Sequence, residues 1–351
     1  MLTDIALRHF RCFDSLACEF APGMNVIVGP NAQGKTSLLE AACILLRLQS
    51  PRVTKLAAAI QHERRGFALD GHFAKRHMQF YFSPQRKKLA LDSVEQKSAA
   101  DYLDVARVVY FSNADIEIVR GGAEVRRKFL DFVAAQLDAN YRAQLRAYER
   151  ALRSRNFLLK AGKPWREIAA FNQPLVESGN YLTRLRSRLI TELEPHAGEA
   201  QAAITGGGEA VALSYASGRG EDFASALAAS RGEDLRLRQT NIGPHRDDVL
   251  FSINERGSEI ASEGQQRSIV LALKLAQAKL LEAKTGAPPL LLLDDIFGEL
   301  DVARRNALLK NLPSTSQQLV TTTHLDWLRG NAPAAIFDLA RESSRPRPRR
   351  D

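Results

Sequence analysis

The sequence lacks the features of a membrane protein and of a disulfide-stabilised secreted protein. No apolar run approaches the roughly 20 residues that a membrane-spanning helix needs. The apolar run Leu290–Leu293, which follows two prolines, has the length of a buried strand. Only three cysteines occur, Cys12, Cys18 and Cys43, and this odd number argues against a disulfide framework. The N-terminus alternates apolar and polar residues as a strand does, unlike a signal peptide. We therefore expect a cytoplasmic protein without a membrane partner.

The composition is that of a globular protein with an excess of positive charge. The 351 residues are 45% hydrophobic and 25% charged, enough for two domains or for one domain with an insertion. The net charge of +9 indicates an anionic partner. Nucleic acid, an acidic membrane and an acidic protein would all satisfy it, so charge alone does not choose among them.

Residues 29–36 match the phosphate-binding pattern G-x-x-x-x-G-K-[ST]. The run before them predicts a buried strand, Met24–Val28, and the run after them predicts a helix that ends near Arg47. Glycines let backbone N–H groups surround an anion, and the helix N-terminus adds partial positive charge. We expect Lys35 to contact the β- and γ-phosphates and Thr36 to hold Mg²⁺. The expected ATP-binding residues of this loop are Gly29, Pro30, Asn31, Ala32, Gln33, Gly34, Lys35, Thr36 and Ser37.

A pair of carboxylates supplies the second half of the expected nucleotide site. The buried strand at residues 290–293 ends in Asp294 and Asp295. A phosphate loop needs a carboxylate at the end of a neighbouring strand to hold Mg²⁺. We therefore expect Asp294 to join Thr36 at the metal and Asp295 to polarise the attacking water.

Three later segments fit the same kind of site. Ser262 stands where a helix N-cap belongs, and the helix that it opens offers a second anion-binding end. Asp301 follows the acidic pair within a few residues. His324 follows a predicted strand at residues 319–322 and could reach the γ-phosphate, although an exposed loop histidine is the alternative. The expected catalytic residues are Lys35, Asp295 and His324.

The remaining pattern predicts an α/β head interrupted by helices. Residues 2–28 predict two strands ahead of the phosphate loop, and residues 66–92 predict an antiparallel meander. The apolar period becomes helical over residues 125–200, and β structure returns near residue 210. We expect a discontinuous head (1–124 and 201–340), a helical arm (125–200) and a disordered basic tail (341–351).

Arginines recur along two of the predicted helices, at residues 141–160 and 171–193. Arg155 continues the first series, and Arg186 lies within the second. A solvated helix face is the ordinary explanation of such charge, and contact with DNA phosphates is the other. The candidate DNA-contacting residues are Arg142, Arg146, Arg150, Arg153, Arg184 and Arg188.

The order of the motifs resembles that of ABC-type ATPases of the SMC/RecF branch. The phosphate loop is followed by S-x-G-Q-Q, L-L-L-D-D, E-L-D and T-T-T-H. Segments between residues 2 and 327 resemble the bacterial RecF family in particular: Phe10-Arg11, R-R-K-F-L-D from Arg126, Y-x-x-x-L-x-x-R-N-x-L-L from Tyr148, and G-P-H-R-D-D from Gly243. One difference is Ala32, where the family usually has a second glycine. Another is the segment 111–115, which replaces one that often carries a proline and a second acid.

The resemblance implies an ABC-type ATPase head, with a mixed phosphate-loop sheet and an antiparallel meander, that carries an inserted helical arm. It implies that Arg11 joins the ATP-binding residues and that Asp301 lies in the D-loop. It implies an ATP-dependent homodimer in which ATP on one copy meets a signature segment of the other copy. The signature residues are Ser262, Gly264, Gln265 and Gln266.

The resemblance also implies a role in recombinational DNA repair and replication-fork maintenance. The dimer would close on double-stranded DNA at single-strand gaps and act with RecO and RecR to load RecA. Weak ATP hydrolysis would release it, as a switch. Two alternatives remain open: a signalling or scaffold ATPase of this branch that does not bind DNA, and the ATPase subunit of a transporter.

Overall fold

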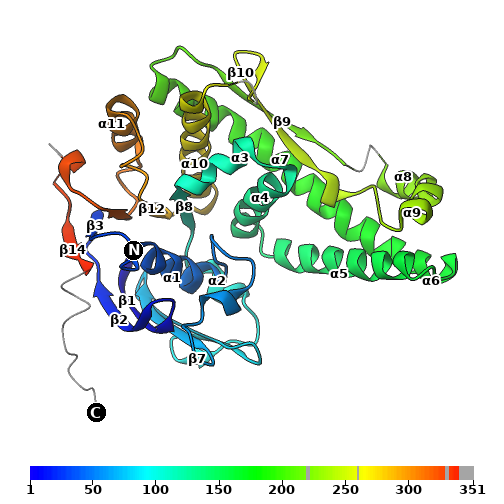
Figure 1. The fold of residues 1–351 in the computed structure, drawn as a ribbon, viewed down its shortest axis with the longest axis horizontal. Coiled ribbons are helices and arrows are strands. Elements are labelled where there is room, and N and C mark those ends of the chain that lie inside the picture. The colour runs from blue at the N-terminus through cyan, green and yellow to red at the C-terminus, as the bar shows by residue number, and fades with distance from the viewer. Residues whose placement is uncertain (219–221, 259–260, 329–331, 340–351) are drawn as a thin grey trace. The chain divides into compact units, whose positions relative to one another are not determined.

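The computed structural model describes residues 1–218, 222–258, 261–328 and 332–339 (Figure 1). The chain forms two compact units. The first contains Met1–Ala114 and the described residues from Leu281 onward, and the second contains Asp115–Leu280. These breaks differ from the domain boundaries expected at 124/125 and 200/201, because the strands that follow the helices pack with them. The functional domain assignment stays a prediction, and the expected tail, 341–351, lies outside the described residues.

One sheet of the first unit is the expected antiparallel meander, and it follows the strand order β2-β1-β4-β5-β6-β7. Its side chains alternate between buried and more exposed positions, as in β4, where Phe67, Leu69 and Phe73 face the core. The strands are β1 (Leu2–Phe10), β2 (Phe13–Glu19), β4 (Phe67–Phe73), β5 (Arg76–Phe82), β6 (Lys87–Leu91) and β7 (Val94–Glu95).

The other sheet of this unit holds the phosphate loop, and all of its neighbouring strands are parallel. Its order is β14-β3-β13-β12-β8. Continuous apolar runs such as Leu290–Leu293 suit this sheet because parallel sheets are covered on both faces. Parallel and antiparallel strands thus occupy separate sheets. The strands are β3 (Met24–Val28), β8 (Val108–Ser112), β12 (Leu290–Asp294), β13 (Gln318–Thr322) and β14 (Ala335–Asp338).

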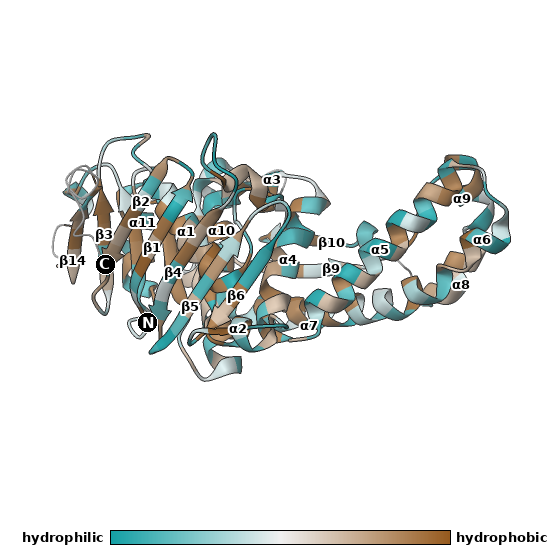
Figure 2. Cartoon of the chain, turned by 90° about the horizontal axis from the view of Figure 1, so that it is seen from below, coloured by the Kyte–Doolittle hydropathy of each residue, from teal (hydrophilic) through white to brown (hydrophobic). Residues whose placement is uncertain are grey.

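Helix α1 (Lys35–Arg47) begins and ends where the sequence predicts, and it packs against strands of both sheets. Every residue of α1 except Thr36 is buried. In Figure 2 the strands of the first unit carry broad hydrophobic bands, and many of their apolar side chains are buried in the core. The other helical elements of this unit are η1 (Leu56–Ala59), α2 (Ala100–Asp104), α11 (Val302–Asn311) and η5 (Asp326–Leu328).

The second unit is mainly helical. Helices α5 (Tyr141–Lys160) and α7 (Asn172–Thr205) pack on each other as a hairpin, with α6 (Trp165–Ala169) at the turn. A three-stranded antiparallel sheet, β11-β10-β9, packs on α7 through β9. Its further elements are η2 (Asn113–Ile116, which enters from the first unit), α3 (Glu117–Arg120), α4 (Ala123–Leu137), β9 (Val211–Ala216), α8 (Phe223–Ala229), α9 (Arg231–Leu237), η3 (Pro244–Arg246), β10 (Asp248–Ile253), β11 (Arg256–Gly257) and most of α10 (Glu263–Thr285).

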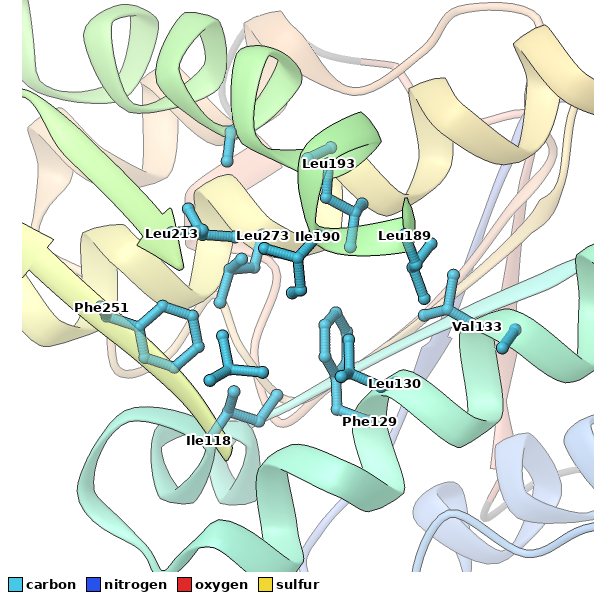
Figure 3. Close-up of a cluster of buried hydrophobic side chains, with 14 of the residues drawn as sticks. Ile118, Phe129, Leu130, Val133, Leu189, Ile190, Leu193, Leu213, Phe251 and Leu273 are labelled. Carbon is cyan, nitrogen blue, oxygen red and sulfur yellow. The ribbon is translucent and has the colours of Figure 1, made fainter. Parts of the chain in front are cut away.

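The core of the second unit joins elements that are far apart in sequence. Figure 3 shows Phe129 and Leu130 of α4 beside Ile190 of α7, with Phe251 of β10 and Leu273 of α10 closing the cluster. These side chains are at most 8% exposed. This shared core explains why the strands after residue 210 belong to the same compact unit as the helices.

Two arginines predicted on the basic faces are instead buried within the second unit, so the prediction was wrong for them. Arg155 is fully buried and donates to Asp234 at 2.8 Å. Arg186 is 3% exposed and pairs with Asp131 at 2.8 Å and with Asp247 at 3.1 Å. A buried guanidinium needs such partners because its desolvation is costly. Both residues therefore hold the fold together and are removed from solvent.

Across the described residues, no helix has both the length and the apolarity that crossing a membrane requires. The three cysteines are free thiols, with Cys18 and Cys43 buried and Cys12 exposed.

Candidate nucleotide-binding site

The phosphate loop follows β3 and turns into α1 through two left-handed residues. Gly34 has φ +93°, and a Cβ atom on it would lie 2.4 Å from Cζ of Phe13 and 2.7 Å from Sγ of Cys12. Only glycine fits there. Ala32 adopts φ +65°, a conformation that costs a non-glycine residue roughly 1 kcal/mol. Ala32 therefore keeps the loop shape that the usual glycine would reach without strain.

Lys35, the first residue of α1, points back into the loop. Its Nζ atom donates to the carbonyl oxygens of Gly29 at 2.7 Å and Pro30 at 2.9 Å, and the residue is only 7% exposed. Burial lowers the pKa of Lys35, while the nearby carboxylates of Asp295 and Asp294 oppose that shift. The ammonium group is thus held within the loop, where phosphate oxygens could replace the two carbonyls.

Thr36 and Asp294 meet across 258 residues of sequence. Oγ1 of Thr36 donates to Oδ1 of Asp294 at 2.8 Å, and Oγ1 of Thr321 donates to the same oxygen at 2.9 Å. The hydroxyl of Tyr110 donates to Oδ2 of Asp294 at 2.9 Å. The parallel strands β8, β12 and β13 bring these groups to one edge of the sheet. These contacts of Tyr110 and Thr321 were not predicted from the sequence, because Tyr110 lies inside a strand without a local motif and Thr321 belongs to the T-T-T-H segment, in which His324 was the candidate residue.

This donor set fits Mg²⁺. Hydroxyl and carboxylate oxygens are its preferred ligands, and Mg²⁺ usually binds to one or two protein groups together with substrate phosphates and water. Thr36 and Asp294 would hold the ion. Among the described residues, no group of three or more His, Cys, Asp or Glu side chains could form a metal cage.

Asp295 follows β12 in a fixed, left-handed conformation with φ +52°. Its N–H donates to Oγ1 of Thr321 at 3.0 Å, and its carbonyl accepts from Nδ2 of Asn113 at 3.2 Å. Burial raises the pKa of Asp295, Lys35 opposes this, and Asp294 adds to it. A carboxylate with a raised pKa is a better proton acceptor. This environment suits the expected role of Asp295 toward the attacking water.

His324 lies in the loop after β13, and its backbone is anchored there. Oγ1 of Thr322 donates to the His324 carbonyl at 2.8 Å and accepts from Nε1 of Trp327 at 3.1 Å. The imidazole is 49% exposed, with Nδ1 3.9 Å from a carboxylate oxygen of Asp326. The loop is fixed while the ring faces solvent, and the role of His324 at the γ-phosphate stays a prediction.

Arg11 lies between β1 and β2 and is engaged in a bidentate ion pair. Its Nε and Nη2 atoms donate to Glu40 at 2.8 and 2.6 Å, and Nη1 donates to the carbonyl of Ala58 at 2.8 Å. Glu40 belongs to α1, is fully buried, and also accepts from Ser50 at 2.6 Å. Arg11 thus ties the β1–β2 hairpin to the phosphate-loop helix, and its contact with ATP stays a prediction.

The signature segment lies in the second unit, at the start of α10. Oγ of Ser262 accepts from the N–H of Gln265 at 3.3 Å, and Oε1 of Gln265 accepts from the N–H of Ser262 at 2.9 Å. This reciprocal pair is a capping box. Gln266 accepts from Arg120 at 2.6 Å. Arg267 and Arg120 hold the pKa of Glu263 below its usual range, so they compensate its charge beside Gly264.

Asp301, the expected D-loop residue, caps α11. Its carboxylate accepts from the N–H of Arg304 at 2.8 Å and also pairs with the Arg304 guanidinium. These contacts lower the pKa of Asp301, the backbone N–H contributing most. The side chain remains half-exposed.

The candidate DNA-contacting arginines lie on the helical hairpin. Arg142 is partly buried, and the other five are exposed. Arg153 lies 3.8 Å from Glu149, Arg188 lies 2.8 Å from Glu192, and Arg184 lies over the ring of Tyr181. Exposed pairs of this kind are weak, so they leave these cations accessible to phosphates.

Comparison with known proteins identifies the family. Residues 1–337 match the family described as the RecF/RecN/SMC N terminal domain. The DNA replication and repair protein RecF of Thermosynechococcus vestitus is 39% identical over 350 residues, covering 92% of this chain and 91% of the relative. RecF of Lactococcus lactis is 33% identical, with 93% and 94% covered.

The comparison with solved structures leads to the same family. The recombination mediator protein RecF-ATPrS of the RecFOR pathway is similar with a TM-score of 0.86 and 30% identity, covering 96% of this chain and 97% of that chain. The Smc head bound to the C-winged helix domain of ScpA has a TM-score of 0.53 and 16% identity, covering 94% and 92%, and shows the fold alone. Fold and site together define an ABC-type ATPase head of the SMC/RecF class. Within that class, the chain belongs to the RecF family, as the motifs predicted.

Proposed function

We propose that this chain binds Mg²⁺-ATP at residues 29–37 and uses the nucleotide to control binding to DNA. The observation that carries the proposal is the contact of Thr36 with Asp294, beside the buried Lys35. The proposal is supported by the closeness of Thr36 and Asp294, the proposed magnesium ligands, to Lys35, the proposed phosphate-binding cation. Bound Mg²⁺ would neutralise phosphate charge during hydrolysis, while Asp295 orients water and Lys35 binds the phosphates.

The ATP-bound form is a homodimer. The N-terminus of α10 carries the positive end of the helix dipole, which suits a phosphate supplied by a second copy. Ser262, Gly264, Gln265 and Gln266 form this surface. Slow hydrolysis opens the dimer, so ATPase activity serves as a switch.

The dimer binds duplex DNA and single-strand/double-strand junctions in the cytoplasm, and it acts with RecO and RecR to help load RecA in recombinational repair. The RecF structure of the RecFOR pathway supports this assignment by likeness. The exposed arginines of α5 and α7 are the proposed phosphate contacts.

The test measures the binding of a fluorescent gapped duplex by anisotropy, at several salt concentrations, with ATP, with ADP and without nucleotide. Affinity that rises with ATP, and that is lost in Lys35→Ala, is the expected result. Tight ATP binding without any DNA affinity would support the scaffold ATPase instead. A stable complex only with a membrane subunit would support the transporter alternative.

A further inference from the structure

The end of the helical hairpin contains an open groove that the nucleotide site does not use. It has a volume of about 580 Å³ and lies between the end of α5, helix α6 and the start of α7. In Figure 2, helices α6, α8 and α9 gather at this end of the hairpin, and apolar and polar residues alternate along them. The groove is lined by Arg153, Ser154, Phe157, Leu158, Glu167 and Phe171.

Phe157 dominates this groove. Its 69% exposure is the largest among the exposed apolar side chains of the described residues, and it projects from a regular helix. Leu235 and Leu237 of α9 are also exposed, by 42% and 39%. A large exposed apolar side chain in a groove is a candidate interaction site, because it gains hydrophobic stabilisation when a partner removes it from water.

The walls of the groove are fixed before any partner arrives. Arg155 of α5 is buried in its pair with Asp234 and is not among the groove residues. The ring of Trp165 in α6 lies 5.6 Å from the Arg155 guanidinium and 4.7 Å from that of Arg231. The N–H of Phe171 donates to the carbonyl of Ile168 at 3.2 Å. A preformed groove lowers the entropic cost of binding.

The charge around the groove is predominantly positive. The exposed basic residues of this segment are Arg150, Arg153, Lys160, Lys163 and Arg166. Within residues 149–171 the exposed carboxylates are Glu149 and Glu167, and Glu149 lies near Arg153. Glu233 of α9 is exposed as well. A partner that fits must therefore combine apolar side chains for the groove with acidic residues for its rim. The apolar lining by Phe157, Leu158 and Phe171 favours a peptide with apolar side chains over a phosphate backbone. Bases that stack on the aromatic rings are the alternative that the experiment tests.

We propose that this groove binds an acidic segment of a partner protein, which seats apolar side chains against Phe157 and Phe171. The interaction needs no nucleotide, so it goes beyond the ATP-controlled DNA binding proposed above. Lys160, Lys163 and Arg166 attract the acidic residues at the rim.

The test uses the full chain and a fluorescein-labelled peptide rich in glutamate, with Leu and Phe at helical spacing. One matched peptide replaces Leu and Phe by Ser, another replaces Glu by Lys, and a labelled oligothymidylate probes nucleic acid. Phe157→Glu is the test variant. Leu250→Glu is its control, because Leu250 is 55% exposed on β10 and is not among the groove residues. Thermal denaturation verifies the fold of each variant, and Phe157→Ser replaces Phe157→Glu if needed.

We expect the acidic apolar peptide to bind the wild type and Leu250→Glu equally, and to lose about tenfold or more in affinity for Phe157→Glu. Neither matched peptide should bind comparably. Equal affinity for Phe157→Glu, or equal binding of the serine peptide, overturns the proposal. Oligothymidylate binding that depends on Phe157, without peptide binding, would assign the groove to nucleic acid instead.

Discussion

Lys35 and Asp295 bear opposite charges and shift each other's pKa within the nucleotide site. Lys35→Ala removes a charged donor, and charged hydrogen bonds are worth about 1.5–3 kcal/mol. We expect ATP affinity to fall roughly 10- to 100-fold. Asp295→Asn leaves the phosphate contacts and tolerates φ +52°, so it should bind ATP normally and hydrolyse it far more slowly. Titration with a fluorescent ATP analogue and phosphate release measure both effects, and wild-type turnover by Asp295→Asn would refute the second.

His245 gives the fold a dependence on pH. Nε2 donates to the carbonyl of Thr240 at 2.9 Å, which leaves Nδ1 to accept from the Tyr148 hydroxyl at 2.6 Å. Burial lowers the pKa of His245 to about 4, below its unfolded value near 6.5. The unfolded chain therefore takes up a proton first as the pH falls.

The resulting stability is fully present above pH ~6.5 and is lost progressively down to pH ~4, by up to about 3 kcal/mol. His245→Gln should remove this part of the pH dependence while lowering stability at neutral pH. Urea denaturation of both proteins across this range is the measurement. If the free energy of unfolding changes with pH in the same way for the variant and the wild type, His245 does not cause this part of the pH dependence.

Residues with local patterns were predictable, and residues with distant partners were not. The phosphate loop and Asp294-Asp295 follow short motifs, and the structure has a hydrogen bond between Thr36 and Asp294. Their shared role at Mg²⁺ stays a prediction. Arg155 shares the helical spacing of the exposed arginines, yet its partner Asp234 lies 79 residues away. Nothing in the local sequence separates a buried arginine from an exposed one. The contact of Tyr110 with Asp294 was not predicted for the same reason, since it depends on the pairing of β8 with β12.

Helix α5 carries the clearest basic face. Each phosphate contact on duplex DNA should contribute about 0.9 to the fall of log K against log salt. Replacing Arg142, Arg146, Arg150 and Arg153 by Ala should flatten that slope by up to about four contacts' worth. The loss should be similar for unrelated sequences, because phosphates carry no sequence information.

ATP binding should not change in this variant. Arg236→Ala with Arg238→Ala is a matched control, because both residues are exposed on or just after α9 in the same unit. An unchanged salt slope in the quadruple variant would show that these arginines form a solvated helix face and do not contact DNA phosphates.

Regular elements were predicted closely, while short ones were missed. Helix α5 has the expected bounds because its apolar side chains recur at helical spacing over twenty residues. Helices α8 and α9 have seven residues each, too few to show a period. Strand β14 has four residues and was not predicted, because its pairing with β3 brings together segments about 310 residues apart.

Measuring the dimerisation of Ser262 variants tests whether Ser262 contacts ATP that is bound to a second copy of the chain. Ser262→Asp retains a good N-cap for α10 but places a negative charge near the phosphate, and Ser262→Arg blocks the surface. Both variants should bind ATP and fail to form ATP-dependent dimers in light scattering. Ser262→Thr, which keeps the cap, should dimerise. ATP-dependent dimers of Ser262→Asp and Ser262→Arg would rule out this contact between copies.

The pairing of β3 has a consequence for synthesis on the ribosome. Among the described strands, β13 and β14 are the neighbours of the phosphate-loop strand, and both follow it in the chain by about 290 residues or more. About 290 residues separate Val28 from Gln318, which at roughly 5–20 residues per second is about 15–60 s of translation. Both edges of β3 stay unpaired during that interval. The nascent chain is then exposed to aggregation, and the nucleotide site forms only after β13 and β14 have been synthesised.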